Sequence, residues 1–201
     1  MGQVWRIETE RLLLREPQPD DVAAWAPFLS DPDFQRYVPV RRSSETWEER
    51  AARNLDGIAA RWQQDPLRAV GWVIVRRSDG QVIGTGGVEE GAEAGDGELD
   101  YRFGKPFWGQ GFGRETAAAM SRFAVEHLPF ERLVAYVVPG NTGSIRIAEG
   151  LGLRFEKQVD YLQFFPDPSM VKLDDPITNM YAAAYADVQL GSGVYRAVAV
   201  G

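Results

Sequence analysis

Apolar and polar positions divide the first third of the chain into one strand and two helices. Residues 6–15 (RIETERLLLR) carry charges at the ends of an apolar run, which predicts a strand. The Pro-Asp-Asp sequence at residues 19–21 is a helix start, and the apolar run behind it predicts a helix to Leu29. A second helix is predicted from residues 43–45 (SSE) onward, because five apolar residues recur there at helical spacing. They are Trp47, Ala51, Leu55, Ile58 and Trp62.

Three strand-like segments and a long helix follow. Residues 69–76 and 81–89 flank the turn signal Ser-Asp-Gly, which predicts a hairpin. A glycine-rich turn then leads to a third strand at residues 98–103 (ELDYRF). A helix is expected from about residue 114 to residue 128, because it has an apolar stripe. The stripe consists of Ala117, Met120, Ala124 and Leu128.

The last third continues the alternation of strands and helices. Strands are predicted at residues 133–138, 154–161 and 179–186, with a short helix at residues 144–149. This order indicates an α/β (α+β) domain with a mixed sheet and helices on its faces. Because no repeat or linker interrupts it, we expect a single domain over residues 1–186. The tail, residues 187–201, could pair with a sheet edge, pair with another subunit or stay disordered.

Composition removes several classes of chemistry. The chain has 201 residues, one histidine and no cysteine, which excludes disulfides, thiolate metal sites and cysteine nucleophiles. We therefore expect no metal site, and a serine–histidine triad is disfavoured. No apolar run approaches the roughly 18 residues of a membrane helix, and the first residues lack a signal-peptide core, so a cytoplasmic protein is expected. The net charge of −7 argues against nucleic-acid binding and agrees weakly with a cationic acceptor.

The stretch FWGQGFGRE, residues 107–115, places three glycines directly before the long helix. It lacks the lysine of a Walker loop, and Arg114 stands where a dinucleotide-binding fingerprint needs its last glycine. Gly111 and Gly113 allow backbone N–H groups to turn toward one point at a helix N-terminus, which favours an anion. A glycine-rich connector without a ligand is the alternative.

Four stretches in order resemble the GNAT N-acetyltransferases, closest to the branch of ribosomal-protein N-terminal (alanine) acetyltransferases. They are IETERLLLREPQPDD, ELDYRF, PFWGQGFGRETAAAMSRFAV and PGNTGSIRIAEGLGLRFE. The resemblance covers residues 6–161. It implies a GNAT-like, mixed, mostly antiparallel sheet of about seven strands, flanked by about four helices. It also implies acetyl-CoA as the co-substrate.

The resemblance assigns the binding of acetyl-CoA to specific positions. The glycine stretch would hold the pyrophosphate through Trp108, Gly109, Gln110, Gly111, Phe112, Gly113 and Arg114. Trp108 departs from the Gln or Arg of many relatives, so a side-chain contact from it is not implied. Phe103 would offer backbone hydrogen bonds to the pantetheine arm, and an N–H there would polarise the thioester carbonyl. Asn141 matches the family's asparagine that binds the pantetheine amides.

The catalytic residues follow the family pattern less closely. Many relatives carry a tyrosine acid seven residues after the asparagine, but Ala148 stands there in this chain. Ser144 is the replacement candidate, with a helix N-cap as its other interpretation. Glu98 and Asp100 share one face of a strand and are candidates for the base, with Glu98 favoured. Glu89 and Glu90 end the neighbouring strand and remain alternatives.

These residues predict transfer of an acetyl group to a primary amine by direct nucleophilic attack. The acceptor would be a protein N-terminus or a small molecule, and residues 34–44 and 164–177, which would select it, carry no readable pattern. Two alternatives remain open: a non-catalytic acyl-CoA-binding sensor or scaffold, and an acidic interaction domain. The oligomeric state is open as well, a homodimer included.

Overall fold

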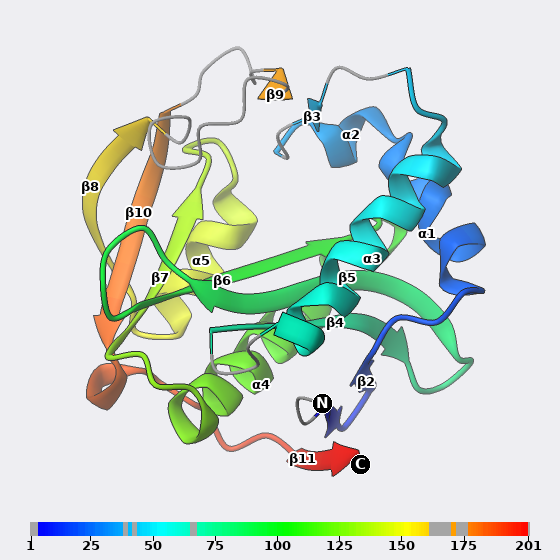
Figure 1. Cartoon of the computed structure of the whole chain (residues 1–201). Helices are drawn as coiled ribbons and strands as arrows, with labels where there is room; N and C mark the ends of the chain where they lie inside the picture. The colour runs from blue at the N-terminus through cyan, green and yellow to red at the C-terminus, as the bar shows by residue number, and fades with distance from the viewer. Residues whose placement is uncertain are drawn as a thin grey trace.

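A nine-stranded sheet forms the framework of the molecule (Figure 1). The computed structural model describes residues 4–37, 40–41, 44–64, 68–160, 170–171 and 177–200. The strands lie in the order β11-β1-β2-β4-β5-β6-β7-β10-β8. Neighbours are antiparallel except for β6 and β7, which are parallel.

The sheet strands are β1 (Val4–Thr9), β2 (Leu12–Arg15), β4 (Ala69–Arg76), β5 (Gln81–Glu90), β6 (Asp96–Phe103), β7 (Arg132–Val137), β8 (Arg154–Asp160), β10 (Ile177–Ala184) and β11 (Tyr195–Val200). A separate pair is formed by β3 (Val40–Arg41) and β9 (Met170–Val171). The helices are α1 (Asp21–Leu29), α2 (Pro32–Gln35), α3 (Trp47–Gln64), α4 (Phe112–His127) and α5 (Thr142–Gly150), with short 3-10 turns η1 (Lys105–Phe107) and η2 (Tyr185–Asp187). In the part of the chain that the structure describes, no helix could cross a membrane.

The sheet has two strands more than the seven expected. The predicted first strand breaks after Thr9, whose hydroxyl accepts the Leu12 N–H at 3.0 Å, so the segment becomes the two strands β1 and β2. The tail adds the other strand, because all six residues of β11 pair with β1 at the sheet edge. The predicted strands at residues 154–161 and 179–186 correspond to β8 and β10, and Tyr161 lies outside the described residues.

The helices also differ in detail from the expectation. Helix α3 begins at Trp47, later than the SSE sequence indicated, because Thr46 and Glu49 form a capping box. The Glu49 N–H donates to the Thr46 hydroxyl at 3.2 Å, and the Thr46 N–H donates to the Glu49 carboxylate at 2.8 Å. A short helix that the pattern did not predict, α2, begins after Asp31, whose carboxylate accepts the Asp33 N–H.

Helices cover both faces of the sheet, which explains why β4 is an almost continuous apolar run. Its residues Trp72 and Ile74 pack into the core shared with α4, whereas Val73 and Val75 pack with α1 and α3. The helices α1 and α3 therefore lie on one face, and α4 and α5 lie on the other (Figure 1). The candidate site lies at the parallel pair β6 and β7, between the helices of the two faces.

Candidate active site

The parallel strands β6 and β7 separate after only a short stretch of pairing. The register joins Asp96 to Arg132 and ends at Glu98 opposite Val134. Both strands continue beyond this point, β6 to Phe103 and β7 to Val137, and they diverge in Figure 1. One edge of β6 therefore faces a gap in the middle of the sheet.

The backbone of β6 directs polar groups into this gap. The Gly104 N–H donates to the Ile83 carbonyl on β5 at 3.0 Å, and amide directions alternate along a strand. The backbone groups of Phe103 and Tyr101 consequently point away from β5 and toward the gap. The Phe103 carbonyl is already occupied, because it accepts the Trp108 indole N–H at 2.7 Å. The Phe103 N–H remains available to a ligand. The Trp108 hydrogen bond holds the start of the glycine loop against the end of β6.

The glycine loop lies at the N-terminus of α4 beside this gap. Gly109 and Gly111 have φ angles of 72° and 83°, in the left-handed region that favours glycine. Gly111 is the N-cap of α4 and has no side chain that could accept a hydrogen bond from the first N–H groups of the helix. The first N–H groups of the helix therefore remain available, at the end where the dipole attracts anions. Arg114 is exposed in this first turn, and its side chain has no ion pair within the described ranges.

A clamp between the N-terminal hairpin and α4 fixes the loop from the other side. The Arg11 guanidinium donates to the Glu115 carboxylate at 2.7 Å and to the Gln110 carbonyl at 2.9 Å. The Thr9 hydroxyl donates to the same carboxylate at 2.6 Å. This clamp was not predicted from the sequence, since its partners lie about a hundred positions apart and residues 6–15 were expected to form one uninterrupted strand.

The start of α5 places Asn141 and Ser144 across the gap from β6. Asn141 is the N-cap, and its side-chain oxygen accepts the Ser144 N–H at 3.1 Å. The N-cap interpretation of Ser144 is therefore wrong, because Ser144 lies inside the first turn. The Asn141 amide nitrogen is left as a donor, so capping and ligand binding are compatible.

Tyr101 faces Ser144 from β6. Burial raises the pKa of Tyr101 to about 12, and a hydrogen bond with the Ser144 side chain acts in the opposite direction. Ala148, at the position of the family's tyrosine, is buried in the core and carries no polar group. Tyr101 thus supplies a phenol next to Ser144 from β6, whereas the family's tyrosine would lie on α5. The sequence did not predict this role for Tyr101.

A group of carboxylates lies on the α3 face of the sheet. Glu98 on β6 lies directly opposite Glu89 on β5, and Asp100 follows two residues later on the same face. The Arg61 guanidinium of α3 reaches between them, 2.9 Å from Glu89 and 3.5 Å from Asp100. Gly87 makes room for this guanidinium, since a Cβ there would collide with it.

Glu98 is the carboxyl group of this cluster with the strongest perturbation. It is 7% exposed, and one of its side-chain oxygens is buried without a hydrogen-bond partner in the described part of the chain. Burial, followed by the charges of Asp100 and Glu89, raises the pKa of Glu98 to about 8. Arg61 contacts Glu89 and Asp100 directly but only weakens this shift on Glu98 from a distance. Glu98 can therefore take up a proton near neutral pH.

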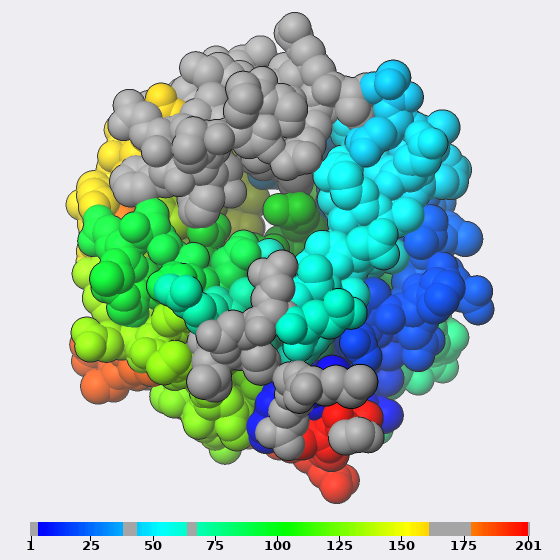
Figure 2. Space-filling view, in the orientation of Figure 1, coloured from blue at the N-terminus to red at the C-terminus, as the bar shows by residue number. Residues whose placement is uncertain are grey.

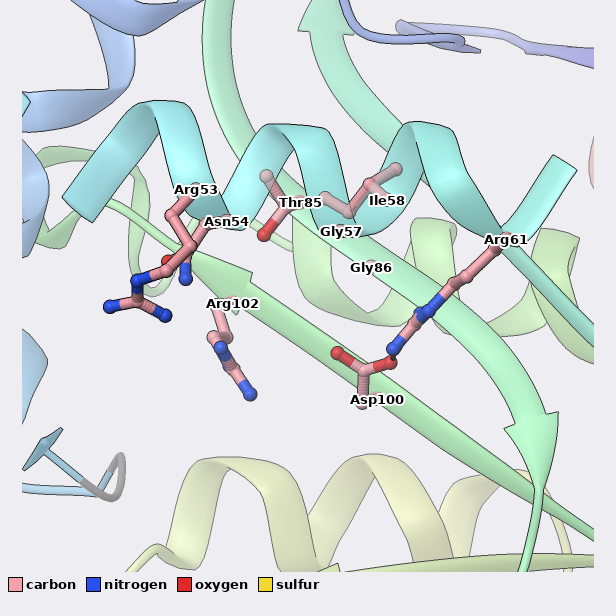
Figure 3. Close-up of a pocket in the computed structure, with 9 residues that line it drawn as sticks. All are labelled: Arg53, Asn54, Gly57, Ile58, Arg61, Thr85, Gly86, Asp100 and Arg102. Carbon is pink, nitrogen blue, oxygen red and sulfur yellow. Dashed lines mark hydrogen bonds and ion pairs between the residues drawn. The ribbon is translucent and has the colours of Figure 1, made fainter. Parts of the chain in front are cut away.

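A pocket of about 250 Å³ opens between α3 and the strands β5 and β6. Figure 2 shows the surface hollowed beside α3, and Figure 3 shows the lining side chains. Asp100 lines this pocket, whereas the buried Glu98, two residues earlier on the same face of β6, does not. The structure thus places the two predicted carboxylates next to each other, and Asp100 is the one that reaches the pocket. Glu90 is exposed and pairs with Arg68 instead.

A family model described as an acetyltransferase (GNAT) domain matches residues 11–154. The chain belongs to the GNAT acetyltransferases. An uncharacterized N-acetyltransferase p20 of Bacillus licheniformis is 29% identical over 157 residues, 75% of this chain and 83% of that protein.

Solved structures share the fold of this GNAT acetyltransferase. The ribosomal-protein-S5-alanine acetyltransferase of Vibrio fischeri matches with a TM-score of 0.71 at 16% identity, over 92% of this chain and 98% of that one. RimJ of Mycobacterium smegmatis, in complex with CoA-disulfide, matches with a TM-score of 0.68 at 19% identity, over 90% and 87%. These matches confirm the expected fold class. Among the described residues of this GNAT acetyltransferase, no group of acidic, histidine or cysteine side chains could hold a metal ion.

Proposed function

We propose that the chain transfers the acetyl group of acetyl-CoA to a primary amine by direct attack, with Glu98 as the general base. The observation that carries this proposal is the buried Glu98 carboxylate with an unpartnered oxygen, at the point where β6 and β7 separate. A carboxyl group with a pKa of about 8 accepts a proton from an ammonium ion more readily than an ordinary one. Asp100 would help to hold the amine at the mouth of the pocket.

The gap suits the pantetheine arm of acetyl-CoA, and the α4 N-terminus suits its pyrophosphate. The Phe103 N–H and the Tyr101 backbone face the gap in the manner of an unpaired strand edge. The open N–H groups from Gly111 to Arg114, together with the Arg114 charge, provide the anion site. Asn141 adds its amide nitrogen from α5.

The reaction requires three proton movements. The ammonium group loses a proton to Glu98, directly or through water, and its nitrogen then attacks the thioester carbonyl carbon. The carbon–sulfur bond breaks, and the thiolate of coenzyme A takes a proton from the Tyr101 hydroxyl. The nitrogen, cationic after the attack, releases its second proton as the amide forms, and this proton returns to Tyr101 through Ser144, while Glu98 gives its proton to solvent. With a pKa of about 12, the Tyr101 hydroxyl carries its proton at neutral pH.

Two measurements test the proposal: the binding of acetyl-CoA and the release of free thiol from it. Isothermal titration with acetyl-CoA should give a saturable heat, and a panel of primary amines should release free thiol from acetyl-CoA. Binding without thiol release from any amine would favour a sensor or scaffold instead. Absence of binding at high micromolar acetyl-CoA would contradict both functions.

Tyr101→Phe should lower kcat about 10- to 100-fold while the KM for acetyl-CoA changes little, because the variant removes a proton donor. Steady-state thiol release measures this effect. Ser144→Ala should lower kcat in the same direction, and the double variant should lose less than the product of the two single effects.

Tyr185→Phe is the matched control for Tyr101→Phe. Tyr185 is also a largely buried phenol, but it lies on η2, and it has no hydrogen-bond partner among the residues that the structure describes. Its variant should retain the wild-type kcat. An unchanged kcat in Tyr101→Phe would remove Tyr101 from the mechanism.

A further inference from the structure

The pocket beside α3 is charged differently at its two ends. One end contains Asp100 and Arg61, which are paired with each other. The other end contains Arg102 of β6 together with Arg53 and Asn54 of α3. Figure 3 shows Arg53 and Arg102 on one side of the pocket and Asp100 with Arg61 on the other. An acceptor in this pocket therefore meets an acidic group and basic groups at once.

Arg102 is the notable charge at the basic end. It is half-buried, its backbone pairs with Thr85 on β5, and its guanidinium forms no ion pair or hydrogen bond in the described ranges. Arg53 differs, because it binds Glu45 through two bonds of 2.8 and 2.9 Å. An unpaired guanidinium at the wall of a pocket is a ready partner for a carboxylate or a phosphate.

The position of Arg102 on the strand sets the spacing between the two ends. Asp100 and Arg102 are two residues apart on one face of β6, which corresponds to roughly 7 Å along the strand. Thr85, opposite Arg102 on β5, also lines the pocket and offers a hydroxyl at the basic end. The pocket therefore matches a molecule with an amine at one end and an anionic group several bonds away.

We propose that the acceptor is a primary amine joined by a short chain to an anionic group. The amine lies at Asp100, within reach of Glu98, and the anionic group binds Arg102 and Asn54. This proposal rests on the proposed acetyl transfer and adds the acceptor class to it. It also excludes diamines as preferred acceptors, although the carboxylate cluster and the net charge of −7 would favour them if Arg102 were absent.

Three acceptors of equal chain length test the proposal. They are 5-aminopentanoate, its neutral counterpart 5-aminopentanamide, and pentane-1,5-diamine. Thiol release from acetyl-CoA gives kcat/KM for each, and we expect the carboxylate to exceed the amide and the diamine by about tenfold or more. The dipeptide amides Ala-Glu and Ala-Gln form a second pair, which shows whether the anionic group belongs to a small molecule or to the second residue of a peptide.

Arg102→Gln should remove the preference. The ratio of kcat/KM for 5-aminopentanoate over 5-aminopentanamide should fall to about one, and Arg102→Lys should restore part of it. The ratio is used because Arg102 also affects the charge of Glu98, an effect that both acceptors share and that cancels. Arg196→Gln is the control, since this arginine is exposed on β11 at the far sheet edge, and its variant should keep the wild-type ratio.

Three results would overturn the proposal, and they are distinguishable from one another. Thiol release with an equal or lower rate for the carboxylate, or with a ratio that Arg102→Gln does not change, contradicts the acceptor class alone. No thiol release with any of the five amines contradicts the acetyl transfer itself. If Arg102→Gln raises the KM for acetyl-CoA while the acceptor ratio stays unchanged, Arg102 belongs to the co-substrate site.

Discussion

Glu98→Gln lowers kcat/KM for a primary amine by about 100-fold or more, because the substitution keeps the side-chain shape and removes the proposed base. The effect depends on pH in a defined direction. Glu98 acts only when it is deprotonated, so the ratio of wild-type to variant kcat/KM rises with pH and levels off above about 8. Rates for one acceptor between pH 6 and 9.5 measure this ratio, and the titration of the amine cancels from it.

Glu90→Gln provides the matched control for Glu98→Gln. Glu90 lies on the adjacent strand and is exposed, with its charge paired to Arg68 at 2.8 Å. This variant should retain kcat/KM within about twofold, as surface changes usually do. An equal loss in both variants would indicate a general charge effect, and no loss in Glu98→Gln would exclude Glu98 as the base.

The stability of Glu98→Gln tests the raised pKa of Glu98 independently of activity. Between the ordinary carboxyl pKa of 4.5 and about 8, the folded protein holds a proton on Glu98 that the unfolded chain has released. The free energy of unfolding of the wild type therefore falls as the pH rises through this window. Glutamine is neutral throughout, so Glu98→Gln should gain stability relative to the wild type, by on the order of a few kcal/mol at pH 9. Urea unfolding at pH 6 and pH 9 measures the difference.

Gly111→Ala weakens acetyl-CoA binding by about 10- to 100-fold, the equivalent of one lost hydrogen bond to a charged group. Gly111 has a φ of 83°, and an alanine there either strains the backbone or turns the next peptide group away from the helix N-terminus. Its Cβ would also lie 3.3 Å from the Arg11 guanidinium. Isothermal titration with acetyl-CoA measures the change in Kd.

Gly80→Ala separates the loss of the anion site from simple backbone strain. Gly80 has a φ of 73° in the hairpin between β4 and β5, and a Cβ there meets nothing within 4 Å. Both variants should unfold at lower urea concentration than the wild type, but Gly80→Ala should bind acetyl-CoA normally. If Gly111→Ala also binds normally, the glycine loop is a connector and not an anion site.

The pattern of apolar and polar residues within each segment was sufficient to predict much of the fold. All four apolar residues of the stripe predicted for α4 are buried, as 3.6-residue spacing requires. Alternation along β6 correctly placed Glu98 and Asp100 on one face. Glu98 is more buried than Asp100 because β7 pairs with β6 as far as Glu98 and then diverges from it. The residue pattern of β6 alone does not show where this pairing ends.

The residues that the sequence analysis missed depend on contacts between distant segments. Arg61 meets carboxylates 28 and 39 positions away, and Arg11 meets Glu115 across 104 positions. Tyr101 was overlooked because the family pattern directs attention to a position on α5, where this chain has Ala148. Residues 164–177, which were expected to select the acceptor, lie mostly outside the described residues, so the acceptor proposal depends on Arg102 instead.

The pairing of β11 with β1 has a consequence for how the chain folds. Val4 pairs with Val200, so the first strand of the sheet is completed by the last one. The contact joins residues far apart in sequence, and it forms only after residues 195–200 have been made. During synthesis, this sheet edge therefore stays open until these residues have left the ribosome. The acetyltransferase site, built from strands and helices in between, can assemble before that edge is closed.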